Sequence, residues 1–161
     1  TKVKAIIQGG QEAWKVDDGL KKNNVSVVYT NIYSLPVRDD DEYDYLFTAP
    51  AKMQQAGIKF AISTGDFGAE VRDLPYHAGI AAAFGLPKEE ALKSVTLYPA
   101  QILGIADKLG SIEVGKTANL VVTNGDMLEH RTDVKYLFIN GRLIPLTSRH
   151  TELFEQFKDR K

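Results

Sequence analysis

Short apolar runs alternate with amphipathic stretches along the first part of the chain. The apolar runs contain β-branched residues without a helical period, which is typical of strands in a parallel sheet covered on both faces. They lie at residues 3–7, 25–29 and 58–63. Residues 11–22 and 44–56, between them, predict helices, the second interrupted near Thr48–Pro50 because proline cannot continue the hydrogen-bond ladder. The order β-α-β-α-β predicts an α/β fold with right-handed crossovers.

The pattern changes after the third strand. Three helices are expected at residues 75–84, 88–95 and 99–105, and from residue 107 glycines separate short β-type runs. These runs lie at 120–123, 136–139 and 142–144, with a hairpin turn at Asn140-Gly141. Residues 150–160 predict a terminal amphipathic helix. We therefore expect three parts, at residues 1–106, 107–149 and 150–161.

Composition narrows the class of protein without identifying it. The 161 residues suffice for a sizeable core, and a net charge of -1 gives no electrostatic basis for binding nucleic acid or an anionic membrane. The absence of cysteine excludes disulfides and cysteine-based nucleophiles or metal sites. The compartment stays open between cytoplasm and periplasm. Because the chain begins at Thr1 and enters a strand at once, we expect it to be a fragment.

One carboxylate stands where α/β folds place their chemistry. Asp66 follows the third strand and a small-residue turn, and ligands of such sheets bind beyond the carboxyl ends of the strands. An isolated aspartate there more often caps a helix or a turn. His77, His130 and His150 are far apart and predict no self-contained zinc site, and His77 is expected to pack or cap. The loop at 30–43 is either a solvated surface loop or a loop over a pocket.

Several motifs in the second half occur in an order that resembles the C-terminal end of the metal-dependent amidohydrolase superfamily, closest to imidazolonepropionase-like members. The blocks are Gly-Leu-Pro-Lys-Glu-Glu-Ala-Leu at 85–92, Tyr-Pro-Ala-Gln-Ile-Leu-Gly-Ile at 98–105, Gly-Ser-Ile-Glu-Val-Gly-Lys-Thr-Ala-Asn at 110–119 and Ile-Asn-Gly-Arg at 139–142. The resemblance implies that the chain is the C-terminal part of a (β/α)8 barrel, its last three β/α units, followed by part of a small β-sandwich and a terminal helix.

The same resemblance implies a metal site and gives Asp66 a role in it. The family's metal ligands are histidines and carboxylates after several barrel strands, and Asp66 matches the aspartate after the eighth. It is expected to bind a divalent metal, zinc first, or to accept a proton from metal-bound water. Gln8 stands where a sixth-strand histidine is expected, and it is a candidate substrate contact together with Tyr29 and Arg72.

The function implied is hydrolysis of amide or cyclic amide C–N bonds in small molecules, other than peptides, by metal-activated water. Most of the family's ligands lie outside this sequence, so the isolated chain is expected to be inactive and to bind no metal tightly. The alternative is a non-catalytic assembly or interaction module with the same fold. An unpaired edge of the sheet at residues 3–7 predicts self-association or pairing with a missing N-terminal part.

Overall fold

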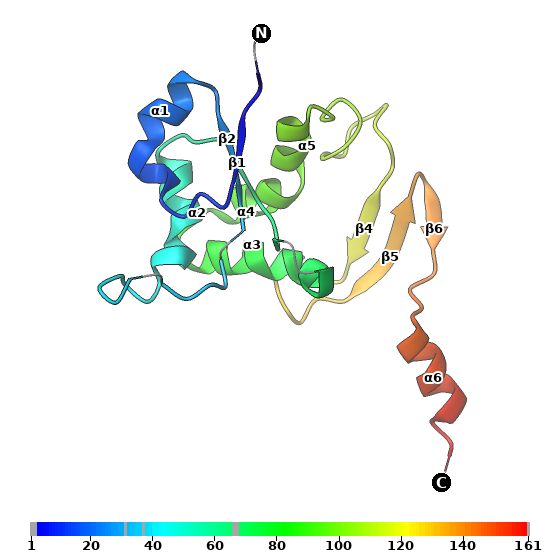
Figure 1. Cartoon of the computed structure of the whole chain (residues 1–161). Helices are drawn as coiled ribbons and strands as arrows, with labels where there is room; N and C mark the ends of the chain where they lie inside the picture. The colour runs from blue at the N-terminus through cyan, green and yellow to red at the C-terminus, as the bar shows by residue number, and fades with distance from the viewer. Residues whose placement is uncertain (1–2, 31, 37, 66–67, 161) are drawn as a thin grey trace.

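A parallel sheet forms the centre of the N-terminal part of the chain (Figure 1). The computed structural model describes residues 3–30, 32–36, 38–65 and 68–160. Strands β1 (Ile6–Gln8), β2 (Ser26–Tyr29) and β3 (Phe60–Ile62) pair in the order β1-β2-β3, all parallel. The predicted β-α-β-α-β order is confirmed. The first strand begins at Ile6 instead of residue 3, because only its last residues pair with β2.

The first predicted helix divides into two pieces. Residues Ala13–Val16 form a 3₁₀ turn, η1, and α1 follows at Asp17–Lys22. Asp17 and Asp18 lie in the first turn of α1, with Lys21 and Lys22 in its last turn, which is the charge order that the helix dipole favours.

Helix α2 (Tyr45–Gln55) is continuous, so the predicted interruption at Thr48–Pro50 is wrong. Pro50 has no N–H to donate to the carbonyl of Leu46, one turn earlier. The hydroxyl of Tyr29, on β2, donates a hydrogen bond of 2.8 Å to that same carbonyl oxygen. The sheet thus satisfies the acceptor that proline leaves open, and the helix continues through Pro50.

Four further elements follow β3. They are the 3₁₀ turn η2 (Gly68–Asp73) and the helices α3 (Leu74–Ala83), α4 (Lys88–Val95) and α5 (Leu97–Leu103). Helix α4 has the predicted bounds, whereas α5 begins two residues before residue 99 and ends at Leu103, before Gly104 with φ 76°. Among the described residues, no helix is long and apolar enough to cross a membrane.

Apolar side chains of β2 and β3 and of helices α2, α3 and α4 form the main core. Its largest fully buried members are Tyr29, Phe60, Ile32, Met53 and Leu86. The core therefore lies between one face of the parallel sheet and the helices.

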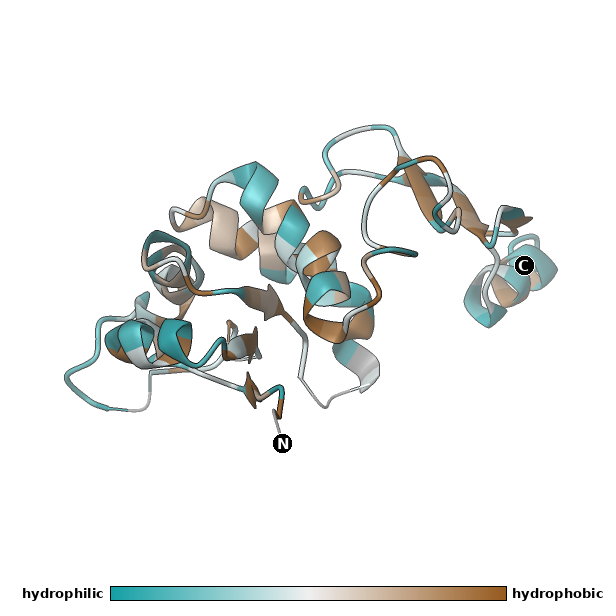
Figure 2. Ribbon diagram, turned by 90° about the horizontal axis from the view of Figure 1, so that it is seen from above, coloured by the Kyte–Doolittle hydropathy of each residue, from teal (hydrophilic) through white to brown (hydrophobic). Residues whose placement is uncertain are grey.

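A second, antiparallel sheet lies to one side of this part in both views (Figures 1 and 2). It contains β4 (Leu120–Thr123), β5 (Val134–Ile139) and β6 (Arg142–Ile144). Asn140 and Gly141 join β5 to β6 with φ values of 52° and 74°, so the predicted two-residue turn is confirmed. Helix α6 (Arg149–Phe157) follows, with a capping box between Ser148 and Thr151.

Both faces of the antiparallel sheet carry exposed apolar side chains. In the register of β4 and β5, Val121 lies opposite Leu137 on one face and Val122 opposite Tyr136 on the other. Val121, Val122 and Tyr136 are all exposed, and no described residue of α6 is buried. This sheet therefore has no core of its own in the described structure.

The connection between β4 and β5 fastens the second sheet to the helices. Leu128 of this connection belongs to the main core, and a Cβ added at Gly79 in α3 would lie 2.6 Å from its carbonyl oxygen. Lys88 of α4 pairs with Asp126 at 3.0 Å. The ring of His130 stacks on Tyr76 of α3, with centroids 3.8 Å apart.

Candidate functional site

The parallel sheet has two unlike faces, and the register identifies the face that is turned away from the helices. Val27, Tyr29, Phe60 and Ile62 belong to the core with the helices. Neighbouring residues of a strand point to opposite faces, so Gln8, Val28 and Ala61 point away from that core. These three are level with one another, since Gln8 is paired with Val28 and Val28 with Ala61.

Polar residues and a glycine lie where the strands end. Gln8 ends β1, Thr30 follows β2, and the backbone N–H of Ser63 donates to the carbonyl of Tyr29 at 2.9 Å. The N–H of Gly65 donates to the Ser63 hydroxyl at 3.2 Å, and a Cβ added at Gly65 would lie 3.7 Å from the Cβ of Thr30. We call Gln8, Thr30, Ser63 and Gly65 the carboxyl-edge cluster.

The cluster contains one predicted site residue and two that sequence reasoning missed. Gln8 lies at the carboxyl end of its strand, as expected. Thr30 and Ser63 were not singled out, although both are polar residues directly after an apolar strand. Asp66 follows Gly65 in the sequence and lies outside the described residues, so its roles stay predictions.

Tyr29 and Arg72 have quite different surroundings. Tyr29 is fully buried on the helix-facing side of β2, burial raises the pKa of its hydroxyl, and that hydroxyl donates to Leu46. Arg72 lies on η2 with an exposed side chain, its Nε 3.7 Å from Oδ1 of Asp73. The described contacts of both residues are structural, and their roles as substrate contacts stay predictions.

The loop after β2 is held near its start and near its middle. Ile32 is fully buried in the main core, close to the carboxyl end of β2. Further along, Nη1 of Arg38 lies 3.3 Å from Oε1 of Glu12, which also accepts hydrogen bonds from Lys15 at 2.7 Å and Tyr45 at 2.8 Å. These bonds, that of Lys15 first, lower the pKa of Glu12. The described residues of the loop thus have contacts with the core and with η1 and its flank.

A complete metal site is not formed by the residues that the structure describes. They contain no group of three or more histidine, aspartate or glutamate side chains able to hold an ion. Gln8 offers only an amide, which is a poor ligand for zinc. The described side chains of the carboxyl edge thus do not fit a zinc ion by themselves, and such an ion would need further ligands.

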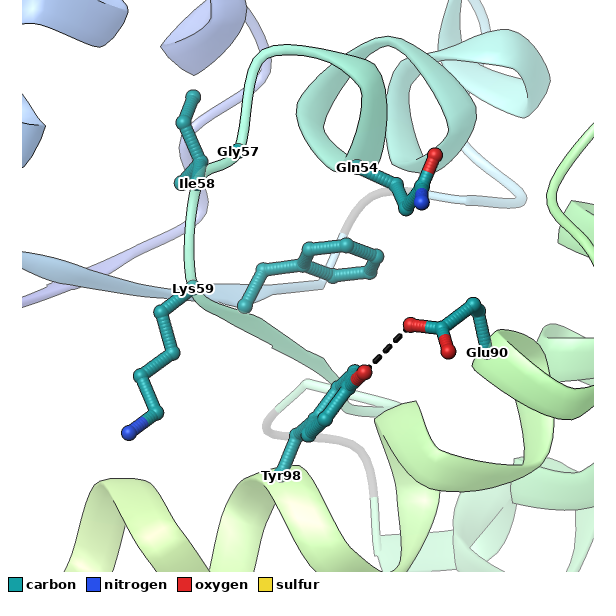
Figure 3. A pocket seen from close by; sticks show the side chains of 7 residues that line it. Gln54, Gly57, Ile58, Lys59, Glu90 and Tyr98 are labelled. Atoms are coloured by element: carbon teal, nitrogen blue, oxygen red, sulfur yellow. Dashed lines mark hydrogen bonds between the residues drawn. The ribbon is translucent and has the colours of Figure 1, made fainter.

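A cavity of about 270 Å³ opens at the other end of β3, where the strand begins (Figure 3). Phe60 is one of its lining residues, and the Tyr98 hydroxyl donates to the Glu90 carboxylate across the cavity (Figure 3). This hydrogen bond is the first cause of a lowered pKa at Glu90. In α/β folds with parallel sheets, ligands bind beyond the carboxyl ends of the strands, whereas this cavity lies at the opposite end. We therefore assign the candidate site to the carboxyl-edge cluster.

Comparison with known proteins identifies the family. Residues 23–144, which include β2, β3 and the whole antiparallel sheet, match the model of the amidohydrolase family. The chain belongs to this family. The superfamily indicated by the sequence motifs is thereby confirmed.

Individual members of the family agree with this assignment. The chain is 36% identical to imidazolonepropionase of Fusobacterium nucleatum over 109 residues, covering 60% of this chain and 26% of that protein. It is 29% identical to 5-methylthioadenosine/S-adenosylhomocysteine deaminase of Thermodesulfovibrio yellowstonii over 126 residues, covering 62% of this chain and 28% of that protein.

A solved structure is similar to this chain in fold. An amidohydrolase from Thermotoga maritima MSB8 superposes with a TM-score of 0.77 and 28% identity, covering 87% of this chain and 36% of that chain. The chain thus spans about a quarter of the length of these two curated relatives and little more than a third of the solved one.

Proposed function

We propose that this chain forms the last three β/α units of a (β/α)8 barrel in a hydrolase that cleaves amide or cyclic amide C–N bonds of small molecules. The observation that carries the proposal is the family match over residues 23–144, together with a parallel sheet whose carboxyl edge gathers Gln8, Thr30 and Ser63. The imidazolonepropionase and deaminase relatives support C–N hydrolysis by their names.

In this proposal Asp66 and Gln8 have distinct tasks. Asp66 supplies the carboxylate that accepts or delivers a proton during attack on the scissile carbon. Gln8 donates or accepts hydrogen bonds at the substrate, as an amide does without taking part in proton transfer. Further ligands for a divalent metal, zinc first, come from β/α units outside this chain, so the isolated chain is inactive.

The experiment joins this chain to the preceding β/α units of the Fusobacterium imidazolonepropionase and measures release of carboxylate from a cyclic amide and from an N-acyl amine. We expect turnover by the hybrid and none by the isolated chain. Asp66→Asn should lower turnover of the hybrid by about 10²- to 10⁴-fold, the range of general acid–base catalysis. Asp18→Asn, at an aspartate of α1 with a fully exposed side chain, is the matched control and should leave turnover unchanged.

Full activity in the folded Asp66→Asn hybrid would remove Asp66 from the proposed site. A folded hybrid that hydrolyses neither substrate would instead support the second candidate, a non-catalytic assembly module. The exposed apolar residues on both faces of the antiparallel sheet favour this second candidate, since such surfaces mark interaction sites. In that case this chain would bind the preceding β/α units when they are supplied as a separate chain, and the complex would show no hydrolase activity.

A further inference from the structure

His77 is a buried titratable residue that has no task in the proposed function. It lies in the first part of α3, and only 2% of its surface is exposed. Both of its ring nitrogens are buried without a hydrogen-bond partner in the described structure. A buried polar atom without a hydrogen-bond partner costs free energy of folding, so a buried histidine at this position needs an explanation.

The ring of His77 contacts the loop at the carboxyl end of β2. Tyr33 of that loop meets His77 in a T-shaped arrangement, with ring centroids 4.3 Å apart and an interplanar angle of 81°. Ile32, the preceding residue, is fully buried in the core. These neighbouring side chains fix the start of the loop, and Tyr33 does so through His77.

The surroundings of His77 favour its neutral form. Burial is the main influence and lowers the pKa of His77, while the carboxylates of Glu70 and Asp73 on η2 act in the opposite direction. Its place near the start of α3 also disfavours a positive charge, because the positive end of the helix dipole lies there. Tyr33 is the titratable group facing it from the loop, and α2, α4 and β3, which pack on the same helix, contribute apolar side chains to the core.

We propose that His77 is a positioning residue: in its neutral form it holds Tyr33, and with it the loop after β2, at the carboxyl edge of the sheet, and protonation releases that loop. An imidazolium has two N–H donors, and neither nitrogen has a hydrogen-bond partner among the described residues. The charged ring therefore turns toward water and leaves Tyr33 without its contact. The link to catalysis rests on the proposed function, which places substrate at this edge.

Hydrogen–deuterium exchange tests the proposal in the full chain, at about pH 7.5 and about pH 5.5, the interval in which histidine titrates. After correction for the chemical exchange rate, acidification should reduce protection of the loop after β2. The loss can reach at most about tenfold per pH unit, the limit for one linked proton. His77→Phe, which keeps an aromatic ring and cannot titrate, should show protection that is independent of pH.

His130→Phe is the matched control, because His130 also stacks on a tyrosine but is exposed. This variant should respond to pH as the unchanged chain does. Tyr33→Leu tests the same contact from the other side and should leave the loop weakly protected at both pH values. Circular dichroism at both pH values establishes that each variant is folded.

Equal pH dependence in His77→Phe and the unchanged chain would overturn the proposal, as would a loop in the unchanged chain that ignores pH. Should His77→Phe not fold, Tyr33→Leu decides, since retained pH-dependent protection in that variant would also overturn it. Exchange is measured without substrate or metal. Failure of the proposed hydrolase activity therefore leaves this result unaffected, and the two are tested separately.

Discussion

At the scale of single residues, the hydrogen bond between Tyr29 and Leu46 explains how α2 accommodates a proline. Pro50 removes the donor that would normally serve the Leu46 carbonyl, and the Tyr29 hydroxyl replaces it at 2.8 Å. A buried carbonyl without a donor costs free energy, so the Tyr29 hydroxyl offsets part of the cost of a proline inside α2.

We predict that Tyr29→Phe lowers the free energy of unfolding by about 1–2 kcal/mol, because the Leu46 carbonyl then stays buried without a donor. In a Pro50→Ala background the same change should cost much less, since the backbone N–H of the introduced alanine can donate to that carbonyl. Urea unfolding of the four proteins measures the coupling. Tyr136→Phe, at an exposed tyrosine, serves as the control. Equal costs in both backgrounds would show that the hydroxyl has some other task.

Asp66 gives a second expectation at this scale. It is one carboxylate, whereas a bound zinc ion usually needs three or four protein ligands. After dialysis, elemental analysis of the isolated chain should therefore find far less than about one equivalent of zinc, the amount that a complete site would retain. A retained equivalent that disappears in Asp66→Asn would mean that the chain completes a site without the preceding β/α units.

At the scale of elements, the predictions succeeded where local signals act alone. Helix α4 has the predicted bounds because Pro87 precedes it and Glu89 and Glu90 occupy its first turn. The hairpin at Asn140-Gly141 is equally local, since both residues tolerate positive φ. Strands β4 and β6 were placed correctly on either side of that hairpin by the glycines and asparagines around them.

The predictions failed where a distant residue decides. The Tyr29 hydroxyl donates to the Leu46 carbonyl that Pro50 leaves without a donor. The sequence of the helix alone does not reveal this hydrogen bond. The start of β1 depends on which residues of β2 it meets. The carboxyl-edge cluster was only partly found for the same reason. Gln8 was noticed through a family resemblance, whereas Thr30 and Ser63 require the register to show that they share the face of Gln8.

The close packing of α3 against the Leu128 segment makes a prediction for two glycines. Gly79→Ala would bring a Cβ to 2.6 Å from the Leu128 carbonyl oxygen, which is backbone and cannot turn away. We expect a loss of about 1–3 kcal/mol in unfolding free energy, typical of overpacking. Gly19→Ala, in the helix α1 with open space around it, should instead stabilise by about 0.5–1 kcal/mol through helix propensity.

Urea denaturation of the two alanine variants measures both changes. Hydrogen exchange of the connection between β4 and β5 should also increase in Gly79→Ala alone. A stabilising effect of Gly79→Ala would contradict the prediction, because it would mean that the Leu128 segment does not pack closely on α3.

At the scale of the whole molecule, unpaired surface is the dominant feature. Strand β1 is an edge of the parallel sheet, with Ile6 42% and Ile7 38% exposed, and the antiparallel sheet and α6 add further apolar side chains at the surface. Sheet edges and large apolar patches promote association. The surface agrees with a chain that spans about a quarter of its curated relatives.

We predict that the isolated chain self-associates at micromolar concentration, which light scattering coupled to size exclusion measures as a mass above 17.8 kDa. Ile6→Lys should shift the distribution toward the monomer, because charged side chains at an edge strand oppose pairing. Leu103→Lys, at an exposed apolar residue of α5, tests whether any added charge has the same effect. A stable monomer in the unchanged chain would contradict the prediction.

The bond between Tyr29 and the proline-containing helix also constrains how these sequences can diverge. A lineage that loses the hydroxyl at residue 29 first inherits a destabilised helix, whereas one that first replaces Pro50 restores the local donor and frees residue 29 to vary. The permitted order of substitution is therefore directional. Among close relatives, phenylalanine at residue 29 should occur with a non-proline residue at 50.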